Sequence, residues 1–483
     1  MKENNIEEIE KIDVEEPEDK NLEDQIKMNK SKKGLIILGV AIILIIVALT
    51  IILYFVFKYN VDGQNYIIAR FLIKDLEEYN PLFYSTFTDS IEKMIVNDTE
   101  VNVSNNITFD KTGMVEIELK FNKKLKNLDN LFYHCHSLEE VDLSFLLSEE
   151  VVSASDMFNG CKNLKKIYFG DFETKNIYNI SNMFSGCEKL TTVNVDIFYY
   201  DNLKDIYGLF FNCKELTKIN FGEFNTKNVI NMGKLFSGCT SLTEINFGDL
   251  KNFETKNVED MSYMFYNCSN LESLNLQKFD TSKVIHMNNM FDSCEKLKTL
   301  DIENFDTRNV ENMFYTFSNC NHLRSLNISN LNTSKVIDMF ALFKDCTGLE
   351  SLEISNFNTS LVFDMGEMFG NCTNLTSIDI SNFDVRNVES MLGMFEGCIQ
   401  LTSLDISNFK TEKLEDASFF LNGTVNLKYI DLRRFNTKNL KNKESFFHQN
   451  PDSVTLIYNK SIFDIQIPSN WNAKDVGDNF KKY

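Results

Sequence analysis

Eleven cysteines at a nearly constant spacing are the residues best suited to chemistry in this sequence. They recur every 26 residues from Cys135 to Cys398, apart from one gap of 29 residues. Such a column could hold metal ions, disulfides or core thiols. Metal sites need ligands that converge on one point, and parallel side chains disfavour both convergence and disulfide closure. An odd number of cysteines also excludes full pairing within one chain. We therefore predict buried, reduced thiols that fill space in a core.

The triplet His134–Cys135–His136 looks like a metal ligand set, but alternate residues of an extended segment point in opposite directions. Since Cys135 belongs to the core column, we predict no metal site there and no other cofactor. The sequence has five histidines, no Gly-rich phosphate loop, and no nucleophile–base pair in residues 60–126. It therefore predicts no catalytic residues and a protein that is not an enzyme. A net charge of −21 argues against nucleic acid as a partner, because phosphate binding needs clustered Lys and Arg.

A row of carboxylates and amides is the better candidate for a binding site. These residues stand one position after an apolar strand residue in successive repeats, and Ser or Thr stands two positions before most of them. On a concave sheet such a row could bind a protein, a glycan or bridging calcium. Alternatively, small polar residues simply keep an exposed parallel sheet soluble. The candidate ligand-binding residues are Asn275, Asp301, Asn327, Glu353, Asp379, Asp405 and Asp431.

The repeat that contains both columns predicts how these residues are positioned. In the unit Cys372–Gly397, the apolar residues Leu375, Ile378 and Ile380 form the pattern L-x-x-I-x-I, and the last two share one face of a short strand. A period of 20 to 50 residues is typical of solenoids and related arrays. A single unit cannot bury its own apolar face, so stacked units must close a shared core.

After the strand the apolar period changes. Val388, Met391, Met394 and Phe395 follow the spacing of one helical stripe. In neighbouring units Thr281 and its counterparts stand where a helix N-cap is expected. We therefore predict an α/β fold, a leucine-rich-repeat solenoid with a parallel sheet of about twelve short strands and short helical returns, preceded by one transmembrane helix.

The transmembrane helix is predicted from Leu35–Phe57, which is long enough to span a bilayer and carries no charge. Lysines crowd its N-terminal side, so the positive-inside rule places the N-terminus in the cytoplasm and the repeats outside the cell. A cleaved signal peptide is the rival, but YFVFKYN provides no small-residue cleavage site. The expected organisation is a disordered acidic tail at 1–33, a signal anchor at 34–57, a stalk and cap at 58–126, the solenoid at 127–445 and a C-terminal cap at 446–483.

Within the stalk, IIARFLIKDLEEYNPLFYSTF predicts a helix that breaks near Asn80–Pro81. Ile107–Phe121 alternates apolar and polar residues around a glycine-containing turn, which predicts a hairpin that covers the first repeat. Val454–Asn459 and Ile462–Ile467 are expected to cover the other end of the array, because open arrays need atypical end units.

Two repeats carry a family resemblance. LKTLDIENFDTRNVENMFYTFSNC (Leu297–Cys320) and LTSIDISNFDVRNVESMLGMFEGC (Leu375–Cys398) resemble BspA-like leucine-rich-repeat surface proteins, in the 26-residue variant that recurs in mycoplasma lipoproteins. The resemblance covers about residues 125–445. It implies a cell-surface protein that adheres to host or matrix components, and it brings no catalytic residues. This chain differs from many relatives in lacking a lipidation cysteine.

Together these features predict a membrane-anchored cell-surface protein that acts as an adhesin or recognition module. Its partner would be a host or matrix protein or a glycan, bound without covalent chemistry along the concave sheet. The alternative is a structural surface spacer or antigenic-variation protein without a dedicated ligand.

Overall fold

The computed structural model describes residues 65–76, 80–248 and 252–477. The predicted acidic tail and the predicted transmembrane helix at Leu35–Phe57 both lie outside these ranges. Within the ranges, no helix has the length and apolar character needed to cross a bilayer. The six residues of η1 (Ser85–Ser90), a 3-10 helix, are the one helical element of the described residues.

A mixed sheet occupies the N-terminal part of the described chain. It contains β1 (Tyr66–Ile73), β2 (Ile91–Val96), β3 (Thr99–Val101), β4 (Gly113–Phe121), β5 (Leu138–Asp142) and β6 (Lys166–Tyr168), in the order β3-β2-β4-β1-β5-β6. β1 pairs antiparallel with β4 on one side and with β5, a strand of the first coil, on the other. The N-terminal segment thereby covers the start of the array.

The predicted helix at the start of this segment is wrong. Tyr66–Ile73 forms a strand because its two neighbours satisfy the backbone of both edges, and six of its eight side chains are buried. The predicted hairpin is only half right. Its second arm is β4, but β4 pairs with β1 and β2, whereas Ile107–Asp110 contains no strand.

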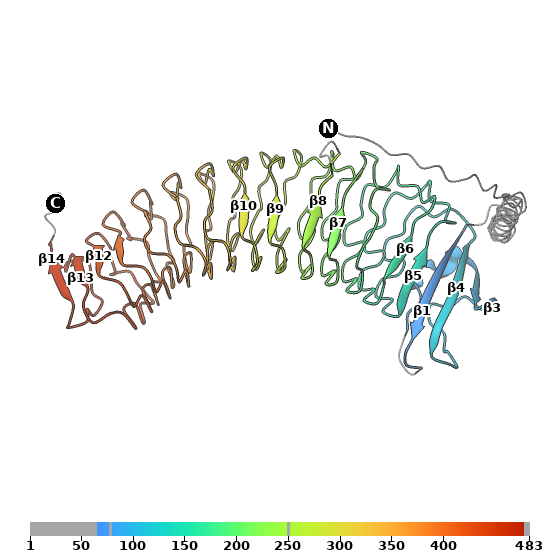
Figure 1. Ribbon diagram of the computed structural model, residues 1–483, viewed down its shortest axis with the longest axis horizontal. Helices are drawn as coiled ribbons and strands as arrows, with labels where there is room; N and C mark the ends of the chain where they lie inside the picture. The colour runs from blue at the N-terminus through green and yellow to red at the C-terminus, as the bar shows by residue number, and fades with distance from the viewer. Residues whose placement is uncertain (1–64, 77–79, 249–251, 478–483) are drawn as a thin grey trace, which may run out of the picture. The chain divides into compact units, whose positions relative to one another are not determined.

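The repeats form a solenoid whose coils succeed one another in chain order (Figure 1). In most coils one segment is a short strand that pairs in parallel with the strand of a neighbouring coil. These strands are β7 (Lys218–Asn220), β8 (Glu244–Asn246), β9 (Ser273–Asn275), β10 (Thr299–Asp301), β11 (Ser403–Asp405), β12 (Tyr429–Leu432), β13 (Thr455–Tyr458) and β14 (Asn472–Asp475). Residues 192–194, 325–327, 351–353 and 377–379 stand at the same repeat position but form no strand. A second column consists of twelve isolated parallel bridges that link Asn127 to Asn442 through every coil between them. The predicted parallel-sheet solenoid of about twelve turns is confirmed.

The predicted helical returns are wrong. In the segment Met391–Gly397 the N–H groups of Met391, Gly393, Phe395 and Gly397 donate to carbonyls of the following coil, at 2.7–3.0 Å. An α-helix would direct these groups to its own chain four residues back. Gly393 and Gly397 also have positive φ angles of 55° and 67°, which interrupt any right-handed helix. The apolar stripe is buried as expected, but it belongs to a ladder between coils.

The threonines predicted as helix N-caps instead join neighbouring coils. The buried hydroxyl of Thr333 donates to the carbonyl of Asn358 at 2.9 Å and accepts from the N–H of the same residue at 2.7 Å. Thr281, Thr307, Thr359 and Thr411 repeat this pair of bonds with the residue 25 positions later. Each hydroxyl therefore satisfies one backbone N–H and one carbonyl between coils.

This threonine ladder makes a testable contribution to stability. We expect Thr333→Val to lower the free energy of unfolding by about 1–3 kcal/mol, because valine has the same shape but leaves buried backbone groups without a partner. Val385 occupies the ladder position in its own coil. Val385→Thr should raise stability by about 0.5–1.5 kcal/mol, since its hydroxyl would face the backbone of Lys410. Urea unfolding measures both, and equal stability of Thr333→Val and the parent chain would show that the ladder bonds contribute nothing.

Candidate ligand-binding surfaces

The predicted polar row lies along the outward face of the strand column, although Asn327, Glu353 and Asp379 stand in coils that form no strand at this position. Asn275 and Asp301 are direct neighbours in the parallel pairing of β9 and β10, so adjacent members are about 4.8 Å apart. Leu300, which lies between the polar residues Thr299 and Asp301 of the same strand, points inward and packs into the core. Six of the seven predicted residues are exposed, namely Asn275, Asp301, Asn327, Glu353, Asp379 and Asp405.

Most of this row also has a local structural task that the sequence analysis missed. In Asp379 and Asp405 the side-chain oxygen Oδ1 accepts the N–H two residues later, at 3.0 Å. Asn275, Asp301 and Asn327 do the same at 3.2–3.3 Å. These Asx turns reverse the chain at the same position in each coil. Hydrogen bonds from neighbouring side chains and backbone lower the pKa of Asp301 and Asp379. The signal in the sequence is the near-exclusive use of Asn and Asp at this position.

Asp431 does not belong to the exposed row. Its side chain is 1% exposed, and its carboxylate accepts from Arg433 Nε at 2.9 Å and from Tyr429 Oη at 3.3 Å. The carboxylate is therefore already neutralised by an ion pair with Arg433. Its partners Tyr429 and Arg433 stand where the preceding coil has Ser403 and Ser407, so the repeat formula alone gave no sign of this change.

A second column of acids and amides lies along the isolated bridges. Asp205, Asp338 and Asp364 each accept the N–H two residues later, at 2.7–2.9 Å, and burial raises the pKa of all three. The negative charges of Asp338 and Asp416 raise the pKa of Asp364 further. Sequence reasoning did not single out this column, and its half-buried side chains act as turn caps.

The cysteine column is built as predicted. All eleven cysteines are buried and free. From Cys161 onward each thiol lies 3.0–3.3 Å from the carbonyl oxygen of a phenylalanine in the preceding coil, for example Cys346 with Phe317. Burial raises the pKa of these thiols, to about 12 for Cys239, Cys294, Cys346 and Cys398.

The histidine–cysteine triplet places its groups on different sides. Cys135 points into the core, whereas the rings of His134 and His136 contact each other outside it, with centroids 5.3 Å apart. His136 Nδ1 lies 2.8 Å from the carbonyl oxygen of Gly160, and burial together with nearby positive charges lowers the pKa of His134. Across the described ranges no group of three or more His, Cys, Asp or Glu side chains could hold a metal ion.

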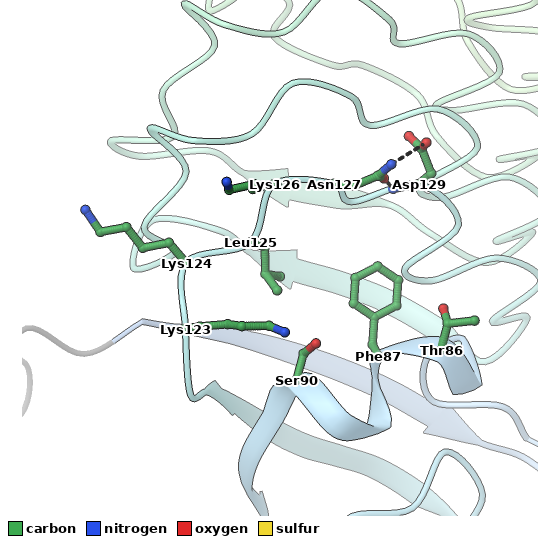
Figure 2. Close-up of a pocket in the computed structure, with 9 residues that line it drawn as sticks. All are labelled: Thr86, Phe87, Ser90, Lys123, Lys124, Leu125, Lys126, Asn127 and Asp129. Atoms are coloured by element: carbon green, nitrogen blue, oxygen red, sulfur yellow. Dashed lines mark hydrogen bonds between the residues drawn. The ribbon is translucent and has the colours of Figure 1, made fainter.

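A cavity of about 520 Å³ lies where the N-terminal segment meets the first coil, between η1 and the stretch that follows β4 (Figure 2). Sequence reasoning missed it, although the run Lys123–Lys126 contains three lysines in a strongly acidic chain. It is lined by Thr86, Phe87, Ser90, Lys123, Lys124, Leu125, Lys126, Asn127 and Asp129.

The repeats match one protein family. The family described as "Mycoplasma protein of unknown function, DUF285" matches residues 126–246, 239–352 and 338–459, which is more than half of the chain. The chain belongs to this family. A search of curated proteins finds no match for this DUF285 protein.

Solved structures similar to the chain include a bacterial leucine-rich repeat protein and a plant peptide hormone receptor. A leucine-rich repeat protein from Eubacterium ventriosum ATCC 27560 is 16% identical, with a TM-score of 0.29, over 63% of this chain and 81% of that one. The TLR13–ssRNA13 complex is also 16% identical, with a TM-score of 0.23, over 68% of this chain. The DUF285 protein spans about half (49%) of the TLR13 chain. The plant peptide hormone receptor RGFR1, in complex with RGF2, is 13% identical, with a TM-score of 0.17, over 70% of each chain.

Proposed function

We propose that this DUF285 protein is a non-enzymatic recognition module that binds a protein or glycan along the strand column. The observation that carries the proposal is the exposed polar row from Asn275 to Asp405. Because its members stand on successive coils, many weak contacts of the same kind can add along one face. Each Asx turn uses one side-chain oxygen, so Asp379 and Asp405 keep a second oxygen for a partner.

The proposal also includes a cellular location for the recognition module. The uncharged segment Leu35–Phe57 would anchor it in the cell membrane as a single-pass protein, with a cytoplasmic N-terminus and an extracellular solenoid. The resemblance of the repeats to BspA-like surface proteins supports this location and an adhesive role. Protease treatment of intact cells tests it, since loss of the solenoid with retention of the N-terminal tail is the expected result.

The binding face can be tested without disturbing the turns. We expect the combined change Asp301→Asn, Glu353→Gln, Asp379→Asn and Asp405→Asn to lower attachment to host cells, matrix proteins or glycans at least tenfold. Asparagine retains the turn bond that Asn275 and Asn327 already make, so the coils should remain intact. Attachment of cells that display the full chain measures the effect, and circular dichroism checks the fold.

A matched control removes the same charge elsewhere. Glu295, Glu311, Glu389 and Glu412 are exposed acids outside the polar row. Changing these four to Gln should leave attachment unchanged. Equal attachment by the parent chain and the row variant would exclude this face as the binding surface.

The second candidate function is a surface spacer without a dedicated ligand. The Asx turns favour it, because they account for Asn and Asp in the row without any partner. Reproducible, saturable binding in a glycan and matrix-protein array would support recognition. Consistent absence of binding would support the spacer.

A further inference from the structure

The cavity beside η1 combines an apolar floor with a polar rim. Phe87 and Leu125 are buried and form the floor. The rim contains the hydroxyl groups of Thr86 and Ser90 and the ammonium group of Lys123. Figure 2 shows the Lys123 side chain directed toward Ser90, while Lys124 extends away from the cavity. Its volume falls within the range of about 300–1,000 Å³ typical of small-molecule sites.

One of the three lysines around the cavity has no acidic side chain beside it among the described residues. Lys124 forms an ion pair with Glu149, and Lys126 lies 3.9 Å from Glu150, so both lysines face acids of the next coil. Lys123 has no acidic partner within 4 Å among the described residues. It is therefore the ammonium group that remains available to a ligand.

The acid that lines the cavity, Asp129, accepts three hydrogen bonds from protein groups. One oxygen of Asp129 accepts from Ser153 Oγ at 2.5 Å and from the N–H of Ser155 at 2.7 Å. The other oxygen accepts from Asn127 Nδ2 at 2.9 Å. Both oxygens of Asp129 are therefore directed to protein donors, whereas Lys123 and the two hydroxyls offer hydrogen-bond donors to a ligand. The cavity suits an anion.

We propose that this cavity binds a small ligand that joins one anionic group, a carboxylate or a phosphate, to a short apolar chain. Lys123 and the hydroxyls of Thr86 and Ser90 would hold the anionic group through charge-assisted hydrogen bonds. The chain would lie over Phe87 and Leu125, away from water. The ligand could be a free amphiphile or a lipid of the membrane, because both present the same chemistry. This inference goes beyond the proposed function and is independent of the polar row.

The proposal predicts a specific order of affinities. With the full chain in nanodiscs of zwitterionic lipid, octanoate and octyl phosphate should bind at one saturable site, at least tenfold more tightly than octanol or inorganic phosphate. Shortening octanoate to hexanoate should weaken binding by about fourfold per methylene. Lys123→Gln should weaken octanoate binding at least tenfold, and Lys123→Arg should retain it. Calorimetric titration measures each constant.

Lys93→Gln is the matched control, because Lys93 is an exposed lysine that does not line the cavity and should not affect binding. Equal losses in Lys123→Gln and Lys93→Gln, or equal binding of octanol and octanoate, would overturn the proposal. The absence of saturable binding would also overturn the proposal, provided that an unchanged unfolding temperature shows the chain to be folded under the assay conditions. Nanodiscs containing anionic phosphatidylglycerol separate the two sources: weaker octanoate binding there identifies a membrane lipid as the occupant, and unchanged binding identifies a free ligand.

Discussion

Replacement of Phe343 by alanine is expected to lower the free energy of unfolding by about 3–5 kcal/mol. Phe343 is 1% exposed and lies in a continuous stack of rings that runs through the core. Its centroid is 5.5 Å from that of Phe317 and 5.8 Å from that of Phe369, and the rings are within 8° of parallel. Alanine would leave a cavity that neighbouring coils cannot close, because their backbones are fixed by hydrogen bonds on both sides.

An exposed phenylalanine provides a control of the same residue type. Phe363 is 43% exposed, so Phe363→Ala should change stability by no more than about 0.5 kcal/mol. The free energy of unfolding of Phe343→Leu should lie between those of the two alanine variants, since Leu421 occupies the stack position in the twelfth coil. Urea titrations followed by circular dichroism measure all three. Similar midpoints for Phe343→Ala and Phe363→Ala would contradict a stabilising role for the stack.

The coil as a repeating unit could be predicted because its signals are periodic. Leu375 and Ile380 are buried in the predicted positions, as are Cys372 and Cys398. These residues follow from a simple requirement, since each coil must present the same apolar face to the next. Ile378 is only partly buried but packs against the same core.

The helical returns could not be predicted from apolar spacing alone. Val388, Met391 and Phe395 are buried whether the backbone forms a helix or a ladder, so the stripe does not distinguish the two. The distinguishing signal stands before each cysteine. That position holds Gly, Asn, Asp, Ser or His in every repeat from His134 to Gly397, and each has a positive φ. Gly and Asn tolerate this conformation best, which marks a turn instead of a helix.

The strand β1 was mistaken for a helix because its sequence shows no alternation. Its neighbours β4 and β5 cover both edges, and both faces are largely buried, so a continuous apolar run is stable there. A strand buried in this way cannot be distinguished from a buried helix by periodicity. Only the pairing with β4 and with the first coil decides between them.

The candidate binding surfaces were predicted only in part. Asn275 and Asp301 were located correctly on the exposed face of their strands, because strand alternation fixes which side chains point outward. Asp431 was misplaced because its ion pair with Arg433 depends on the end of the array. The cavity near Lys123 joins η1 to residues more than thirty positions later, and no local pattern encodes such a contact.

The second large effect concerns the thiols in alkaline solution. Burial raises the pKa of the cysteines, to about 12 for Cys239 and Cys346, whereas an unfolded thiol titrates near 8.5. Above about pH 8.5 the unfolded chain therefore loses thiol protons that the folded chain retains. Stability should be fully present below that pH and fall as pH rises through this window. Each thiol contributes on the order of 1 kcal/mol per pH unit there, and eleven thiols lie in one array.

Urea unfolding at pH 7.5, 8.5 and 9.5 measures this fall, and we expect the unfolding midpoint to drop far more steeply above pH 8.5 than below it. Cys320→Ala removes one titrating group and should reduce the slope by about 1 kcal/mol per pH unit.

Thiol labelling supplies an independent check, because the reactive thiolate is suppressed by burial. An exposed thiol introduced by Ser377→Cys should react promptly with an aqueous reagent, while the eleven native thiols react only on unfolding. Rapid labelling of several native thiols, or a midpoint independent of alkaline pH, would show that the column is open to solvent.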